Sequence, residues 1–154
     1  MTLENTLRQQ LNNAESGGFH VSFGGWNVTL VADQRDSLSC ALKELTLDNS
    51  TQIREELPVW ADRVARQASG LMEPLRLVEV DRPLGKALLR SAAPAARDGK
   101  TFYYELLLER TSRTIATLHR YAGDRQAGEP RTAVPFVLTN DAIVKLVTDI
   151  VGAN

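Results

Sequence analysis

The chain has 154 residues, of which 43% are hydrophobic and 24% are charged, and its formal net charge is -1. These values are ordinary for a globular protein and exclude a chain that is disordered throughout. The 18 basic and 19 acidic residues are mixed along the sequence, so no basic face for nucleic acid is predicted. The length is close to the commonest size of one domain, and we expect residues 1–154 to form a single α+β domain.

The sequence also restricts the cellular compartment and the kinds of covalent or metal cross-link. Cys40 is the only cysteine, which excludes an intramolecular disulfide and a cysteine-rich zinc site. The N-terminal residues have neither the basic start nor the apolar run of a signal peptide. No segment approaches the roughly 20 apolar residues that a membrane span needs. We therefore expect a soluble, cytoplasmic protein with no membrane contact.

The N-terminal third predicts one helix followed by strands. Leucines at helical spacing predict a helix over residues 2–15, ended by Gly17 and Gly18. Apolar residues then alternate from Phe19 and again, in the opposite phase, from Trp26. The glycine pair at 24–25 forms either a tight turn between two strands or a bulge inside one long strand, and we favour the turn.

The middle of the chain contains two ambiguous segments. Residues 37–47 fit a strand or a helix, and we assign a strand. A second helix follows, with Trp60 on its apolar stripe and Gly70 at its end. Pro58 conflicts with the interior of a helix, so the helix either kinks there or begins there. A strand from Leu75, interrupted near residues 81–83, precedes a turn-rich loop at 91–100.

The clearest strand pair lies between residues 102 and 121. If its turn centres on Thr111 and Ser112, Leu108 faces Ile115 and Tyr104 faces His119. That register also pairs Phe102 with Tyr121. One face of the pair is then nearly apolar and is expected to face the core; it comprises Phe102, Tyr104, Leu106, Leu108, Ile115, His119 and Tyr121.

A last strand and a helix close the chain. Pro135 lies inside the strand around residues 134–138 and lacks a backbone donor, so we expect an edge strand or a bulge. Thr139 or Asn140 is the expected cap of an amphipathic C-terminal helix, which Gly152 ends.

Together these elements predict an α+β fold. An antiparallel sheet of about five or six strands is covered on one face by the second and third helices. The order of the elements and the size of the chain resemble those of the small secretion chaperones, which bind an extended effector segment as dimers. No motif accompanies this resemblance, so it implies no role for any residue.

Few residues indicate chemistry. His20 and His119 are far apart in sequence and lack a partner at metal-ligand spacing, so we predict no metal site and no cofactor. Cys40 lies among apolar residues and is predicted to be a buried, inert thiol. There is no phosphate-binding glycine loop and no nucleophile elbow, and whether the protein is an enzyme stays open.

His119 is the residue on the predicted inner face that most needs an explanation. A buried imidazole requires a hydrogen-bond partner, and either a bond to Tyr104 satisfies both groups or His119 lies at the rim of the sheet. The alternative is a ligand-facing or acid–base histidine in a cavity between the sheet and the C-terminal helix. In that case Tyr104, His119 and Tyr121 are the predicted ligand-binding residues.

Two functional hypotheses follow. The first is a non-enzymatic protein-interaction module, chaperone-like or an accessory subunit of a larger assembly, that forms a homodimer and docks partners on a strand edge or apolar helix. The second is a small-ligand-binding protein or enzyme with the cavity lined by Tyr104, His119 and Tyr121. Filled space over the inner face of the 102–121 hairpin favours the first hypothesis, and open space favours the second.

Overall fold

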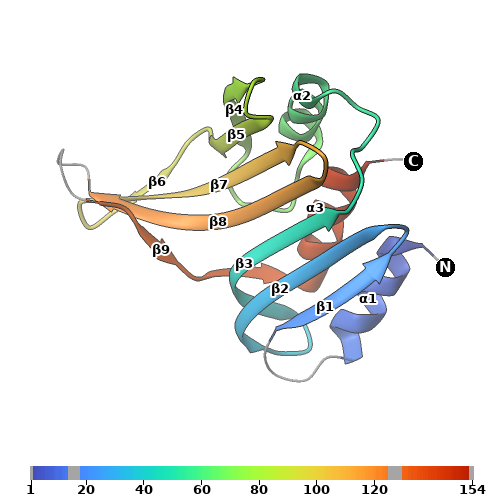
Figure 1. Cartoon of the computed structure of the whole chain (residues 1–154). Helices are drawn as coiled ribbons and strands as arrows, with labels where there is room; N and C mark the ends of the chain where they lie inside the picture. Colours follow the sequence, from blue (N-terminus) through green and yellow to red (C-terminus); the bar gives the residue numbers. More distant parts are fainter. Residues whose placement is uncertain (1, 14–17, 125–129, 153–154) are drawn as a thin grey trace.

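The protein is a large antiparallel sheet with helices packed on one face (Figure 1). The computed structural model describes residues 2–13, 18–124 and 130–152, which form three helices and ten strands. In chain order they are α1 (Leu3–Asn13), β1 (Phe19–Phe23), β2 (Trp26–Arg35), β3 (Ser39–Asn49), α2 (Leu57–Gln67), β4 (Leu75–Asp81), β5 (Lys86–Ser91), β6 (Ala95–Arg97), β7 (Lys100–Arg110), β8 (Thr114–Asp124), β9 (Thr132–Val134), β10 (Phe136–Thr139) and α3 (Asn140–Val151).

The sheet is larger than the five or six strands that the sequence predicts. Its main path runs β1-β2-β3-β8-β7-β5-β4, and β10, β6 and β9 add to β3, β7 and β8. The difference has two causes. Segments in which the alternation of apolar and polar residues is interrupted form hairpins of two strands, and strands of three residues are too short to show a periodicity. One of these short strands, β6, lies within the segment expected to be a loop.

Three local predictions that left alternatives open are resolved. Gly24 and Gly25 form a two-residue hairpin turn, with φ of +61° and +84°, between β1 and β2. Only glycine adopts two successive positive φ angles at little steric cost, which explains the pair. Residues from Ser39 onward form a strand, as assigned. Helix α2 begins at Leu57 with Pro58 in its first turn, so it has no interior proline and the kinked alternative is wrong.

The predicted register of the β7–β8 hairpin is wrong by one residue. Leu108 pairs with Ala116, and Tyr104 pairs with Arg120 rather than with His119. The reason is a three-residue loop, residues 111–113, where the prediction placed a two-residue turn. Because side chains alternate with a period of two, the extra residue moves every β8 side chain to the opposite face.

The shifted register places leucine in the core in place of histidine. The inner face of β8 carries Ala116 and Leu118, both buried, and Ile115, His119 and Tyr121 lie on the outer face. Burying Leu118 instead of His119 removes apolar surface from water without enclosing an imidazole, so this register is favoured energetically.

The strand predicted around Pro135 is divided into two. β9 pairs with residues 120–122 of β8, and β10 pairs with residues 39–42 of β3. Pro135 lies between them, where β3 and β8 diverge, and its missing N–H therefore interrupts no ladder. Among the described residues each short strand pairs on one side, which agrees with the expected edge character.

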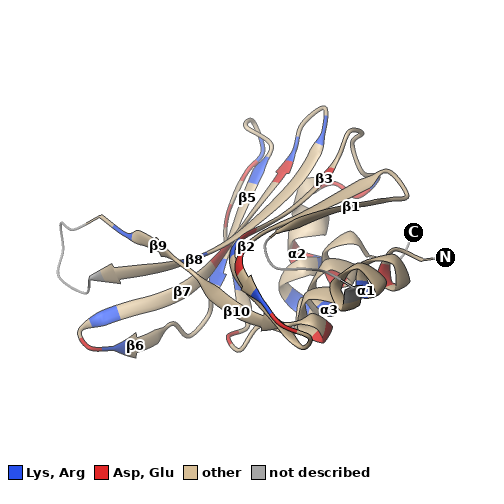
Figure 2. Cartoon of the chain, turned by 90° about the horizontal axis from the view of Figure 1, so that it is seen from below, with Lys and Arg blue, Asp and Glu red and all other residues tan. Residues whose placement is uncertain are grey.

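One apolar core lies between the inner face of the sheet and the helices (Figures 1 and 2). Leucines from five neighbouring strands form a continuous row across this face: Leu30, Leu45, Leu118, Leu106 and Leu89. Trp60 of α2 is fully buried, and its indole N–H donates to the Ile150 carbonyl of α3 at 3.0 Å. No helix within the described residues has the length and hydropathy needed to span a bilayer.

Both ends of helix α3 lie where the sequence predicts. The Thr139 hydroxyl accepts a hydrogen bond from the Ala142 N–H at 3.1 Å, so Thr139 is the N-cap. Gly152 is the C-cap residue. The open end of the β7–β8 hairpin, which is the end away from the 111–113 loop, projects together with β6 and β9 beyond the helices (Figure 2).

Candidate functional site

Tyr104 lies alone of the three predicted ligand-binding residues on the inner face of the sheet. It is buried, and its ring meets Phe136 edge to face, with ring centroids 5.6 Å apart. The Arg120 guanidinium also lies over the Tyr104 ring, 4.4 Å from its centre. Burial raises the pKa of the Tyr104 hydroxyl above its usual value. Tyr104 is therefore packed against other side chains of the protein, where the ligand hypothesis requires it to line an opening.

His119 and Tyr121 lie together on the outer face. Their ring centroids are 5.7 Å apart, and His119 Nε2 is 2.8 Å from a carboxylate oxygen of Glu44. Tyr104 is on the opposite side of the sheet, so the three residues do not line one cavity. The His–Tyr bond proposed as the structural explanation is also absent, since His119 contacts Glu44 instead. A role for any one of the three in ligand binding stays a prediction.

A second charged cluster surrounds Glu105 on the same outer face. Glu105 is buried, contacts Arg131, and lies 3.7 Å from Arg90. Each arginine also covers a tyrosine ring, Arg90 that of Tyr103 and Arg131 that of Tyr121. The buried Glu105 carboxylate is paired with two arginines, and each arginine lies over a tyrosine ring. We therefore interpret the cluster as a structural one that stabilises the part of the hairpin beyond the helices.

The inner face of the hairpin contains one further ion pair. Arg120 is 2.9 Å from Glu73, which lies in the segment between α2 and β4, and both side chains are largely buried. Arg120 Nη1 and Glu73 Oε1 have no hydrogen-bond partner among the described residues. The sequence offers no signal for this pair, because 47 residues separate its members and neither belongs to a motif.

The remaining candidates for catalysis lack the required geometry. Cys40 is buried, as predicted, and burial raises the pKa of its thiol, so it is a poor nucleophile at neutral pH. Its Sγ is 3.7 Å from the amide oxygen of Asn140. In the part of the chain that the structure describes, no three His, Cys, Asp or Glu side chains converge as a metal site requires.

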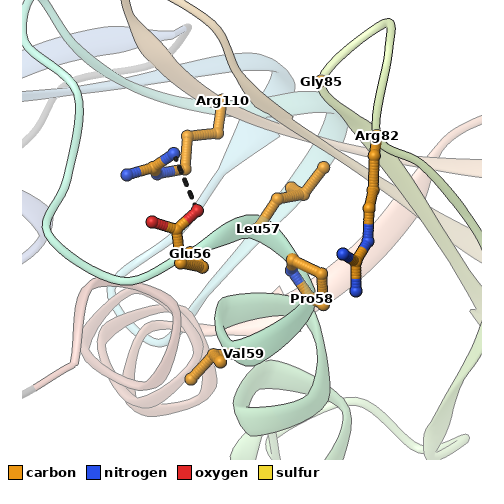
Figure 3. Close-up of a pocket in the computed structure, with 7 residues that line it drawn as sticks. All are labelled: Glu56, Leu57, Pro58, Val59, Arg82, Gly85 and Arg110. Carbon is orange, nitrogen blue, oxygen red and sulfur yellow. Dashed lines mark ion pairs between the residues drawn. The ribbon is translucent and has the colours of Figure 1, made fainter.

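A pocket lies instead between the first turn of α2 and the turn that joins β4 to β5 (Figure 3). Its volume is about 410 Å³, within the range of roughly 300–1,000 Å³ typical of ligand sites. We call it the Arg82 pocket, and it is lined by Glu56, Leu57, Pro58, Val59, Arg82, Gly85 and Arg110. Pro58 helps to form it, because α2 starts at this corner of the sheet.

The two arginines of the Arg82 pocket differ in their surroundings. Arg110 is largely buried; it donates to the Ile53 carbonyl at 3.1 and 3.2 Å and lies 3.6 Å from Glu56. Arg82 is exposed and extends from the β4–β5 turn alongside Pro58 (Figure 3). It makes no hydrogen bond or ion pair with any described residue. The pocket therefore presents one uncommitted cation.

Exposed apolar side chains accompany this cation. Val59, in the lining, is 57% exposed, and Leu84, in the adjacent turn, is 61% exposed. The sequence does not predict this site, although Pro58 and the apolar stripe that contains Trp60 belong to the helix that forms it. Trp60 points into the core. Arg82 and Pro83 were noticed only as an interruption between strands.

Comparisons of the chain with protein-family models, with curated proteins and with solved structures found no match. Function is therefore inferred from the geometry of this chain alone.

Proposed function

We propose that this protein is a non-enzymatic protein-interaction module that binds its partner over the Arg82 pocket and the neighbouring Leu84. The observation that carries the proposal is an open pocket with an exposed large apolar side chain, Val59, in its lining; the exposed Leu84 lies in the turn that carries Arg82 and lines a second hollow with Leu88 and Leu107. Exposed apolar residues beside a concave surface are typical of docking sites.

The condition of the reactive side chains supports binding rather than catalysis. His119 is paired with Glu44, the Cys40 thiol is buried, and Glu105 contacts two arginines. A general base or nucleophile needs access to a substrate, which burial restricts for Cys40 and Glu105. A chaperone-like module and an accessory subunit are both forms of this proposal, and a homodimer is compatible with either.

The small-ligand alternative has less geometric support. It requires a cavity between the sheet and α3 lined by Tyr104, His119 and Tyr121, and these side chains lie on opposite faces. The inner face of the hairpin is occupied by its own leucines and by the Tyr104–Phe136 contact. Filled space of this kind is what the interaction hypothesis expects.

Selection from a displayed library of random peptides on the immobilised protein tests the proposal. We expect converging sequences, and synthetic versions should shift the backbone NMR signals of Val59 and Leu84. The double variant Val59→Glu, Leu84→Glu should weaken binding at least about tenfold, since it places charges in the apolar contact. Val137→Glu is the matched control, because Val137 is 66% exposed on another part of the sheet.

Two results would contradict the proposal. One is a selection that yields no converging sequence. The other is a selected peptide that binds the double variant as tightly as the parent protein. Sedimentation equilibrium of the parent and both variants determines separately whether a second copy of the chain occupies the surface.

A further inference from the structure

We infer that the Arg82 pocket recognises an acidic–apolar segment of a partner protein, in which an apolar side chain enters the pocket and a neighbouring carboxylate pairs with Arg82. The inference rests on the proposed function and names the chemistry of its partner. Its evidence is the charge and the polarity of the pocket wall.

Charge complementarity requires one negative group from the partner. Of the three charged side chains in the lining, Arg110 and Glu56 lie 3.6 Å apart and offset each other, and Arg110 is further held by the Ile53 carbonyl. Arg82 has no partner among the described residues. The lining thus has a local charge of +1, centred on a guanidinium that can donate two parallel hydrogen bonds to one carboxylate.

The rest of the lining requires an apolar group beside that carboxylate. Leu57 and Pro58 lie between the two arginines, and Val59 continues the apolar wall (Figure 3). Leu84 belongs to the same turn as Arg82 but lines a second hollow, with Leu88 and Leu107. A segment with only acidic residues would leave this wall in water, and a purely apolar segment would leave Arg82 unpaired.

The same wall disfavours phosphate groups and nucleic acid. A phosphate monoester carries a charge near -2 and is usually bound by clusters of arginines. Here Arg82 is the single uncommitted cation of the lining, because Glu56 and Arg110 offset each other. Inorganic phosphate is therefore a suitable competitor: we expect it to displace the peptide only through general salt screening.

The test uses two short peptides, acetyl-Gly-Leu-Asp-Gly-amide and its Asn counterpart, titrated into the isotopically labelled full-length protein. We expect NMR shifts at residues 56–59 and 82–85, with the Asp peptide binding about three- to fivefold more tightly, the upper part of the range for an exposed ion pair. Arg82→Gln should abolish this difference. Arg76→Gln should preserve it, because Arg76 is an exposed arginine on the outer face of β4.

The four combinations of peptide and protein form a double-mutant cycle that isolates the pairing of Arg82 with the carboxylate. Equal affinity of both peptides for the parent protein overturns the inference, as does an equal effect of Arg82→Gln on both. Binding of neither peptide at about 5 mM also overturns it, since that excludes even millimolar affinity.

These outcomes separate the inference from the proposed function. If library-selected peptides bind at Val59 and Leu84 without a preference for acidic residues, the interaction surface stands and the acidic–apolar specificity is wrong. If self-association shifts the same signals and excludes the Asp peptide, a second copy of the chain is the occupant and the inference is also overturned.

Discussion

Trp60 is expected to make the largest single contribution to the packing of α2 on α3, and Trp60→Phe tests this. The substitution removes the hydrogen bond to the Ile150 carbonyl, worth about 1 kcal/mol net. It also removes roughly 50 Å² of buried ring surface, or about 1 kcal/mol at ~25 cal/mol per Å², and leaves a small cavity. The Ile150 carbonyl still accepts from Arg63 at 3.0 Å, so no buried acceptor is left without a donor.

The expected loss in the free energy of unfolding is therefore about 2–3 kcal/mol. Urea unfolding, followed by the fluorescence of Trp26 and by far-ultraviolet circular dichroism, measures it; the midpoint should fall by about 1–2 M. Val59→Ala is the neighbouring control, because Val59 is 57% exposed, and it should cost less than about 0.5 kcal/mol. A loss below about 1 kcal/mol for Trp60→Phe would refute the described packing of the two helices.

Three further predictions concern the cap, the inner ion pair and the thiol. Thr139→Ala should lower the free energy of unfolding in urea by about 1 kcal/mol, because α3 loses its N-cap acceptor, and Thr139→Ser should restore most of it. Arg120→Met should cost about 2–4 kcal/mol in the same assay by leaving the Glu73 carboxylate unpaired, whereas Arg66→Met, in an exposed pair, should cost less than about 0.5 kcal/mol. The pKa of the Cys40 thiol is raised in the folded state. The neutral thiol therefore contributes to the free energy of unfolding below the unfolded pKa of about 8.5, and this contribution is lost as the pH rises towards the folded value. Unfolding at pH 8 and pH 10 should accordingly show a smaller alkaline loss for Cys40→Ala than for the parent, and an equal loss would contradict the burial of the thiol.

Much of the secondary structure could be predicted because its causes are local. Alternating apolar residues placed strands from Phe19 and Trp26, and the glycine pair between them favoured the turn that the structure contains. Thr139 and Gly152 marked both ends of the last helix, since capping depends on a few neighbouring backbone groups. The size of the sheet was underestimated because β6 and β9 are too short to produce a pattern.

The candidate site could not be predicted in the same way. Its lining comes from three separate parts of the chain, namely residues 56–59, the turn residues Arg82 and Gly85, and Arg110, and none of these contains a motif. The sequence drew attention to His119 and Tyr104 because it suggested that they share a face. One additional loop residue separated them, and no local signal distinguishes a loop of two residues from one of three at this turn.

The sequence by itself determined most of the longer strands and helices, where the last helix is capped, and that Cys40 is buried. These properties follow from the spacing of apolar residues and from short-range hydrogen bonding. Only the tertiary structure decided the register of β7 and β8, the division of the strand at Pro135 and the meeting of α2 with the β4–β5 turn. Each of these depends on which distant surfaces bury the most apolar area without enclosing an unpaired polar group, and that balance is a property of the whole chain.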